Sequence, residues 1–181
     1  MDPGPPNAGS CEVRRLTRRW GRKSRRVMLL CSACLGVLSC GDAWALLQSC
    51  GVSAVAVNFG TYNPLSGSPT VATGTVTVSC TATVLGLLES WTVALNSGNS
   101  VGFSPRQLAN GPSTLNYNLY TSAAYSSIWG DGSGTTSVIS DSQFVAVGTT
   151  TMHYTVYGRI PAGQDAAAGT YVDTIMVTLN Y

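Results

Sequence analysis

The chain has 181 residues, of which 44% are hydrophobic and only 10% are charged, and this length suggests one domain with or without a processed segment. An average soluble domain carries about 25% charged residues, and disordered chains are charged and poor in apolar side chains, so the composition excludes disorder. Residues 1–26 hold eight of the ten Lys and Arg residues, and beyond them only Arg106 and Arg159 could meet a phosphate. A globular nucleic-acid-binding domain is therefore excluded as well.

The first 45 residues have the pattern of a secretory signal. A basic run is followed by an apolar stretch, 27–38, and then by Ala43, Trp44 and Ala45. The apolar stretch is too short to span a bilayer, which takes about 20 residues. A basic region, a short apolar region and an A-x-A site together predict export, with cleavage after Ala45. We therefore divide the chain into a cleaved segment, 1–45, and a mature domain, 46–181, and expect no stable membrane span.

Other interpretations of the N-terminal segment stay open. The basic region is long, so translation could start at Met28 or slightly upstream. Residues 24–29 also resemble a twin-arginine export signal, and Cys40 could be a lipidated cysteine. A short basic amphipathic anchor is a further alternative. The twin-arginine and lipidated forms predict export too, so export is the firmer expectation.

The cysteines divide between the two segments. Four of the six precede residue 45, so the mature domain keeps Cys50 and Cys80. An even number of cysteines in an oxidising compartment predicts one disulfide, with two buried free thiols as the alternative. On the chain-entropy model, closing this loop would stabilise the fold by about 3–4 kcal/mol. Two cysteines and one distant histidine do not make a zinc site, so we expect neither a metal nor another cofactor.

The mature domain shows period-2 alternation of apolar and polar residues, which is typical of half-buried β-strands. In chain order, the predicted strands are 52–59, 75–80, 91–95, 115–119, 144–147, 152–157 and 174–181. Turn-forming runs of Gly, Pro and Asn separate them, and no window of 11 or more residues has a convincing helical period. Short strands divided by turns predict an all-β antiparallel sandwich.

One catalytic motif is present, because residues 98–102 match G-x-S-x-G with Ser100 at the centre. That motif exposes a nucleophile where a strand turns into a helix, but Pro105 follows here without a helical period. His153 lies on the strand face that we expect to meet solvent. Residues 131–134 are too rich in Gly and too poor in carboxylates for a calcium loop. We therefore expect turns and a surface histidine, and we predict no enzyme.

The remaining polar and aromatic residues favour structural roles. Arg106 and Arg159 are isolated cations, and we expect each to meet a carboxylate or a backbone carbonyl. Aromatic residues at strand spacing more often pack across strands than bind sugar. The aromatic residues that could nevertheless line a sugar-binding face are Tyr117, Tyr120, Tyr125, Trp129, Tyr154 and Tyr157. A self-contained secreted adhesin or carbohydrate-binding module is thus an alternative function.

Several motifs of the mature domain occur together, in the order found in one known family. They are 58–62 (NFGTY), 74–80 (GTVTVSC), 106–108 (RQL), 115–120 (LNYNLY), 128–132 (IWGDG), 154–164 (YTVYGRIPAGQ), 169–175 (GTYVDTI) and 177–181 (VTLNY). With them, residues 49–181 resemble the spore coat protein U domain, a family of secreted spore coat proteins and archaic chaperone–usher pilus subunits. The resemblance implies an immunoglobulin-like antiparallel β-sandwich that lacks its final strand.

The same resemblance implies a mode of assembly and a set of partners. A periplasmic chaperone fills the missing-strand position, and a neighbouring subunit's N-terminal extension then replaces it, alongside an outer-membrane usher. The acceptor edge would consist of Ile175, Val177, Leu179 and Tyr181. An unpaired apolar edge at this end of the chain would need a partner or would aggregate.

The expected cleavage limits what the chain could donate. Only 46–49 would precede Cys50, and four residues reach about 14 Å, roughly half of what a donor strand needs. We therefore expect a subunit that accepts a strand and hardly gives one, such as a pilus tip or cap, or a coat protein. The chain is predicted to pass through the periplasm to a cell-surface or extracellular fibre or coat, with roles in adhesion or biofilm formation.

Overall fold

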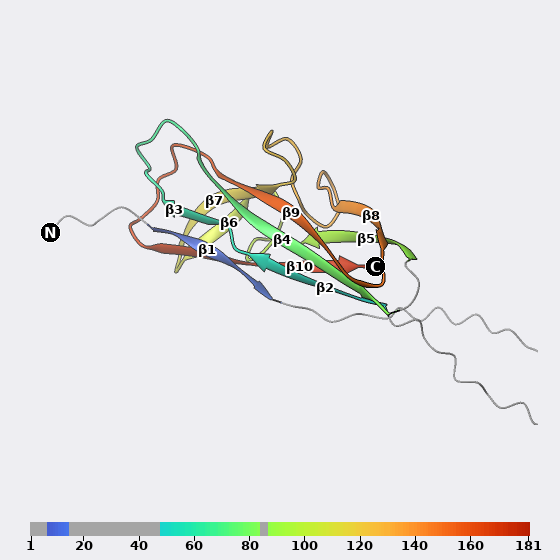
Figure 1. The fold of residues 1–181 in the computed structure, drawn as a ribbon. Helices are drawn as coiled ribbons and strands as arrows, with labels where there is room; N and C mark the ends of the chain where they lie inside the picture. Colours follow the sequence, from blue (N-terminus) through green and yellow to red (C-terminus); the bar gives the residue numbers. More distant parts are fainter. Residues whose placement is uncertain (1–6, 15–47, 84–86) are drawn as a thin grey trace, which may run out of the picture.

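The computed structural model describes residues 7–14, 48–83 and 87–181, and all regular structure in these ranges is β-strand (Figure 1). The ten strands are β1 (Asn7–Arg14), β2 (Gln48–Val55), β3 (Asn58–Thr61), β4 (Thr70–Ala82), β5 (Leu87–Leu95), β6 (Arg106–Asn110), β7 (Ser113–Tyr120), β8 (Ile139–Val145), β9 (Gly148–Ile160) and β10 (Thr170–Asn180). The predicted all-β class is confirmed. This part of the chain contains no helix that is long and apolar enough to cross a membrane.

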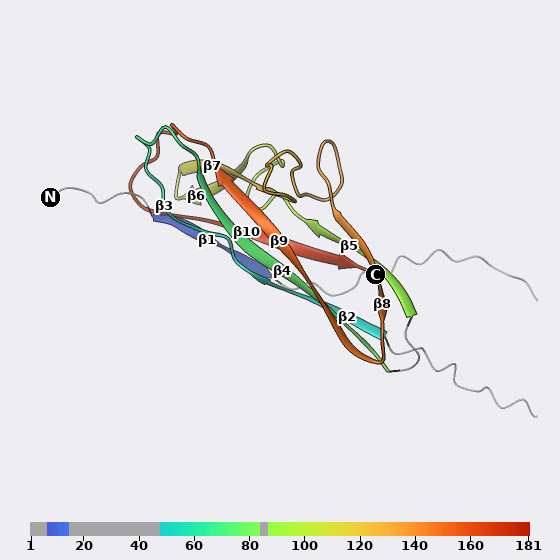
Figure 2. The same ribbon diagram turned by 45° about the horizontal axis from the view of Figure 1, so that its top comes forward.

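The strands form the two layers of a sandwich (Figure 1 and Figure 2). The first layer has the order β2-β4-β9-β7, and its pairings are antiparallel. The second layer has the order β3-β1-β10-β5-β8, in which β1 and β10 run parallel and the other neighbours antiparallel. Strand β6 pairs with β7 and, at Ala109 and Val172, with β10, so it links the layers. The arrangement confirms the β-sandwich that the strand pattern predicts and the immunoglobulin-like form that the family resemblance implies.

The core is formed by the apolar faces of the alternating strands. The apolar residues that alternate along the predicted strands 75–80, 91–95 and 115–119 are buried, and they are Val76, Val78, Cys80, Trp91, Val93, Leu95, Leu115, Tyr117 and Leu119. On β10, Ile175 and Val177 are buried, whereas Leu179 is half-buried and Tyr181 is exposed. Burying one such aliphatic side chain stabilises a fold by about 1.5–3 kcal/mol before entropy costs. These faces therefore hold the two layers together.

A disulfide joins Cys50 of β2 to Cys80 of β4. The two strands are antiparallel neighbours, and these two residues face each other in register. Because β2 is the outermost strand of the first layer, the bond fastens an edge strand to its neighbour. The bond confirms the single disulfide that the cysteine count predicts for the mature domain.

The strand predicted over 52–59 is in fact two strands in different layers. β2 ends at Val55 and pairs with β4, whereas β3 begins at Asn58 and pairs with β1. The run of consecutive apolar residues between 54 and 57 hides this change of layer, because it fits either phase of a period-2 pattern. Val57 and Phe59 then pack into the core.

Gly158 of β9 makes room for this change of layer. A Cβ atom at this position would lie 2.7 Å from both the Phe59 Cζ and the Val57 Cγ1 atoms. Atoms so placed must move apart, so any larger residue would push the start of β3 away from β9. The glycine thereby fixes where the chain crosses between layers.

Candidate functional site

Strand β10 uses its two edges differently. Along one edge, Val177–Asn180 pair antiparallel with residues 92–95 of β5. Along the other edge, residues 170–176 pair in parallel with β1, which in turn pairs antiparallel with β3. Figures 1 and 2 both show β1 running beside β10. β1 therefore fills the position between β3 and β10 in the second layer.

An apolar groove enters the core beside this position. Its lining comes from six strands and from the segment between β2 and β3, and consists of Ala54, Val55, Ala56, Val57, Val76, Leu95, Leu119, Val156, Ile175 and Val177. Every lining residue is aliphatic, and the groove is narrow, with a volume of about 20 Å³. Two of the four predicted acceptor-edge residues, Ile175 and Val177, belong to it, while Tyr181 lines a separate polar groove with Ser90 and Asn180.

β1 is composed mainly of small and polar residues. Its sequence, NAGSCEVR, contains one Val and no Leu, Ile, Met or aromatic residue. Its pairing with β10 also shifts register between Ala8 and Cys11. β1 and β10 are thus joined by a main-chain ladder that is interrupted once.

A buried arginine ties the loops around β6 together. Arg106 begins β6 and is fully buried. Its guanidinium donates hydrogen bonds to the Asn96 carbonyl (3.1 and 2.8 Å), the Trp129 carbonyl (2.7 Å) and the Asn118 Oδ1 atom (2.8 Å). The ring of Phe103 lies 5.1 Å from its Cζ atom. The prediction that Arg106 meets a backbone carbonyl is confirmed.

A buried carboxylate on β10 holds the neighbouring turn. Asp173 is 1% exposed and accepts hydrogen bonds from the Tyr117 hydroxyl (2.6 Å) and from the backbone N–H groups of Asn99 (2.7 Å) and Thr174 (2.8 Å). Gly98, with φ of 67°, lies against this carboxylate so closely that a Cβ atom would collide with it. The turn after β5 is therefore fastened to the strand that lines the groove.

Comparison with known proteins identifies the family of this chain. The family model described as the Spore Coat Protein U domain matches residues 39–178. The chain belongs to this family. The curated "Protein U" of Myxococcus xanthus is 31% identical to it over 144 residues, which cover 72% of this chain and 74% of the relative.

A solved structure also resembles this Spore Coat Protein U domain. It is the CsuC–CsuE chaperone–tip adhesion subunit pre-assembly complex from the archaic chaperone-usher Csu pili of Acinetobacter baumannii. The matched chain is 23% identical, with a TM-score of 0.48 over 75% of this chain. The alignment spans 40% of the length of that chain.

The G-x-S-x-G motif of this Spore Coat Protein U domain forms a turn. The Ser100 hydroxyl oxygen accepts a hydrogen bond from the Gln107 N–H (2.7 Å). His153 is exposed on β9, and its Nδ1 atom hydrogen-bonds the Thr77 hydroxyl (3.0 Å). The structure thus gives the serine and the histidine different partners instead of one site.

The acidic turn at 131–134 is held by its own hydrogen bonds. Asp131 accepts a hydrogen bond from the Ser133 N–H (2.9 Å), and its hydrogen bonds with Ser133 lower the pKa of its carboxyl group. Within residues 48–83 and 87–181, no group of three or more His, Cys, Asp or Glu side chains could hold a metal ion. The expectation of a turn at 131–134 is confirmed.

Two of the six candidate sugar-binding aromatics are core residues. Tyr117 and Trp129 are at most 1% exposed, and the Trp129 Nε1–H donates to the Val93 carbonyl (2.9 Å). They cannot form a surface for a ligand. Size and strand spacing alone did not distinguish them from the aromatics that reach the surface.

Tyr154 belongs to a network at the edge of the second layer. The Trp91 Nε1–H donates to the Tyr154 hydroxyl (2.8 Å), which donates to the Asp141 carboxylate (2.7 Å). Burial, and then the hydrogen bond to Asp141, raise the pKa of Tyr154 to about 12. The same hydrogen bond is the main cause that lowers the pKa of Asp141. The network joins β5, β8 and β9, so it links the two layers.

Proposed function

We propose that this chain is an exported structural subunit of a surface fibre, such as a chaperone–usher pilus, or of a spore or cell coat, assembled by donor-strand complementation. The observation that carries the proposal is the place of β1. β1, which residues 15–47 separate from β2 in the sequence, lies between β3 and β10, beside an all-aliphatic groove. Membership of the Spore Coat Protein U domain family supports the same assignment.

Export would empty the position that β1 occupies. The predicted signal lies between β1 and β2 in the sequence, so cleavage after Ala45 would remove β1 with it. The facing edges of β3 and β10 would then lose their hydrogen-bonding partner, and the groove lined by Ile175 and Val177 would open. An unpaired strand edge beside an exposed apolar groove needs a partner or aggregates.

We propose that a strand from another protein takes this position after cleavage. Main-chain hydrogen bonds to β10 would give affinity, and alternate apolar side chains would enter the groove. Each such side chain would contribute about 1.5–3 kcal/mol before the cost of ordering the donor. We propose a periplasmic chaperone as the first donor and a neighbouring subunit's N-terminal extension as the second, at an outer-membrane usher.

The processed chain would have little to donate in return. β2 begins at Gln48, and both Gln48 and Ser49 pair with β4. Only 46–47 would then precede the sheet, and two residues reach about 7 Å. We therefore propose a tip, a cap or a coat protein over a repeating shaft subunit, with Ile175 and Val177 at the centre of the acceptor edge.

Amide hydrogen exchange on the processed chain, 46–181, tests strand donation residue by residue. The matched probes are a synthetic peptide with alternating large apolar residues and a peptide of the same composition with the alternation scrambled. Strand donation predicts rapid exchange at alternate amides of 170–176, which the alternating peptide alone slows. Slow exchange without any peptide would show that β10 needs no donor. Equal protection by both peptides would show that alternating apolar side chains are not what the site recognises, and either result would contradict the proposal.

A further inference from the structure

Three tyrosines and an arginine form a cluster on the outer face of the first layer. We name it the tyrosine–arginine platform, and it consists of Tyr120, Tyr125, Tyr157 and Arg159. Tyr120 of β7 faces Tyr157 of β9 in register, two positions from Arg159. On β9, Val156, Gly158 and Ile160 are buried, so by alternation Tyr157 and Arg159 point outward, and Tyr120 lies opposite Tyr157. All four are half-buried.

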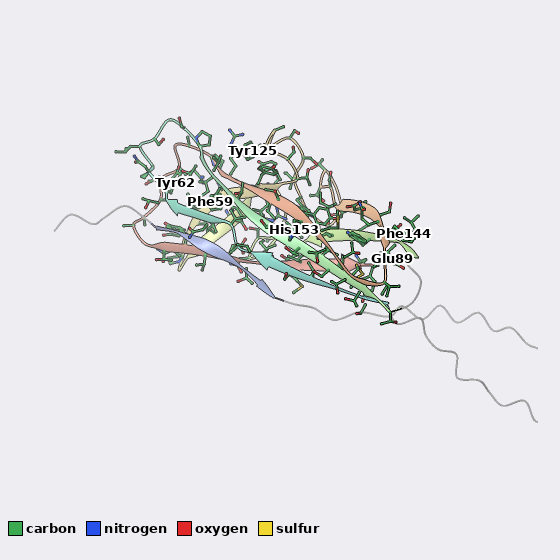
Figure 3. All side chains as sticks on the ribbon, in the orientation of Figure 1. Phe59, Tyr62, Glu89, Tyr125, Phe144 and His153 are labelled. Atoms are coloured by element: carbon green, nitrogen blue, oxygen red, sulfur yellow. A yellow bond between two sulfur atoms is a disulfide. The ribbon has the colours of Figure 1, made fainter. Side chains whose placement is uncertain are left out.

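The platform is held together by ring contacts. The Tyr125 ring meets the Tyr120 ring edge to face, with centroids 5.4 Å apart and an interplanar angle of 90°. The Cζ atom of Arg159 lies 5.5 Å from the centroid of the Tyr125 ring. Tyr125 lies at the upper edge of the molecule in Figure 3, while β1 lies along the lower edge. The platform is therefore separate from the groove beside β10.

Arg159 is unusual among the charged residues. Of the two Lys or Arg residues in 48–83 and 87–181, Arg106 is buried, so Arg159 provides the surface cation of this part of the chain. Within these residues its guanidinium contacts the Tyr125 ring and makes neither a hydrogen bond nor an ion pair. The prediction that it meets a carboxylate or carbonyl is wrong. A planar fork of N–H donors, suited to a carboxylate, is left open.

Tyr125 carries a second, independent sign of a binding site. Its φ is 51°, and among the described residues it alone is a non-glycine residue with positive φ. A bulky side chain is rare in this left-handed region, and such strained residues cluster where ligands bind. The turn that holds it closes through the Tyr125 N–H to the Ser122 carbonyl (3.2 Å) and the Thr121 N–H to the Ser127 carbonyl (3.1 Å).

From these observations we infer that the platform binds an acidic sugar, namely a uronate residue of a polysaccharide. The sugar carboxylate meets the open fork of Arg159, and the apolar face of the pyranose ring lies on the tyrosine rings. Tyrosine hydroxyls supply donors and acceptors for the sugar hydroxyls. A simple anion would use the arginine alone, so the three half-exposed rings favour a sugar ring. The inference does not depend on strand donation.

Titration of the full chain with a galacturonate trisaccharide, followed by NMR, tests this inference. The matched neutral probe is a galactose trisaccharide at the same ionic strength. We expect the acidic probe to bind at least about 10-fold more tightly, as for a hydrogen bond to a charged group. Arg159→Gln should remove this preference, and Arg159→Lys should restore only part of it. His153→Gln, an exposed change on the same face of β9, should leave the affinity unchanged.

Tyr125 gives a variant that separates binding from folding. Tyr125→Gly removes the ring and relieves the left-handed backbone, so binding should weaken about 10-fold while the thermal midpoint stays or rises. Tyr125→Asn, a residue tolerated in this region, provides a second test. Equal affinity for both sugars, unchanged binding by Arg159→Gln, or equal displacement by inorganic sulfate would overturn the inference. Sulfate displacement would indicate a general anion site.

Discussion

Replacing Arg106 by methionine should destabilise the protein severely, because this side chain serves three separate segments. Arg106→Met keeps most of the volume and removes the donors that now reach the Asn96 and Trp129 carbonyls and the Asn118 side chain. Each hydrogen bond to a charged group contributes about 1.5–3 kcal/mol, but methionine also avoids the burial of a charge. The net loss should be about 3–5 kcal/mol, the range for breaking a buried charged network.

Urea unfolding of the purified, oxidised protein measures this loss directly. The midpoint should fall at an unchanged m-value, and the thermal midpoint should drop by about 10–20 °C for a domain of this size. Arg159→Met is the matched control, because it removes the surface cation and should cost less than about 1 kcal/mol. A loss below about 1 kcal/mol for Arg106→Met, or equal losses for both variants, would refute the structural role assigned to Arg106.

Three further predictions concern packing and pH. Tyr154→Phe should cost about 1–3 kcal/mol in urea unfolding, because it leaves the buried Trp91 Nε1–H without its acceptor. The pKa of Asp141 is lowered, so its contribution to stability should be present above about pH 4 and fade at lower pH. The pKa of Tyr154 is raised to about 12, so its contribution to stability should fade between pH 10 and 12. Both slopes should flatten in Tyr154→Phe, and unchanged slopes would contradict the network. Gly158→Ala should lower the free energy of unfolding by about 1–3 kcal/mol through overpacking. Gly51→Ala, with open space around it, is the control and should be close to neutral. Similar losses of stability in both variants would show that β3 does not depend on Gly158.

The strands were predictable where one face of a strand is buried. Alternation marked the inward residues of β4, β5, β7 and β10, because a half-buried strand repeats every two residues. It failed where polar residues are buried. β6, with the sequence RQLAN, has one large apolar residue, so it was not predicted as a strand. By alternation Asn118 falls on the face opposite to Tyr117 and Leu119, yet it is buried and its side chain accepts a hydrogen bond from Arg106.

Long-range contacts explain what the sequence could not show. The acceptors of Arg106 come from positions 96, 118 and 129, which only the folded chain brings together. Nothing local in Asn7–Arg14 indicates a strand beside β10, because that pairing depends on a position left open in a distant sheet. Arg159 and Tyr125 were each considered in the sequence, but their contact arises from a turn and a strand that lie more than thirty residues apart.

Strand donation requires that the processed chain, 46–181, does not form a complete sandwich by itself. The most direct measurement is the state of association and the thermal unfolding of the processed chain, 46–181, oxidised and free of any chaperone. Strand donation predicts oligomers or a low, concentration-dependent midpoint, converted by an alternating apolar peptide into one stable complex. A monomer with a high, cooperative and concentration-independent transition, without any added strand, would contradict strand donation and favour a self-contained secreted module.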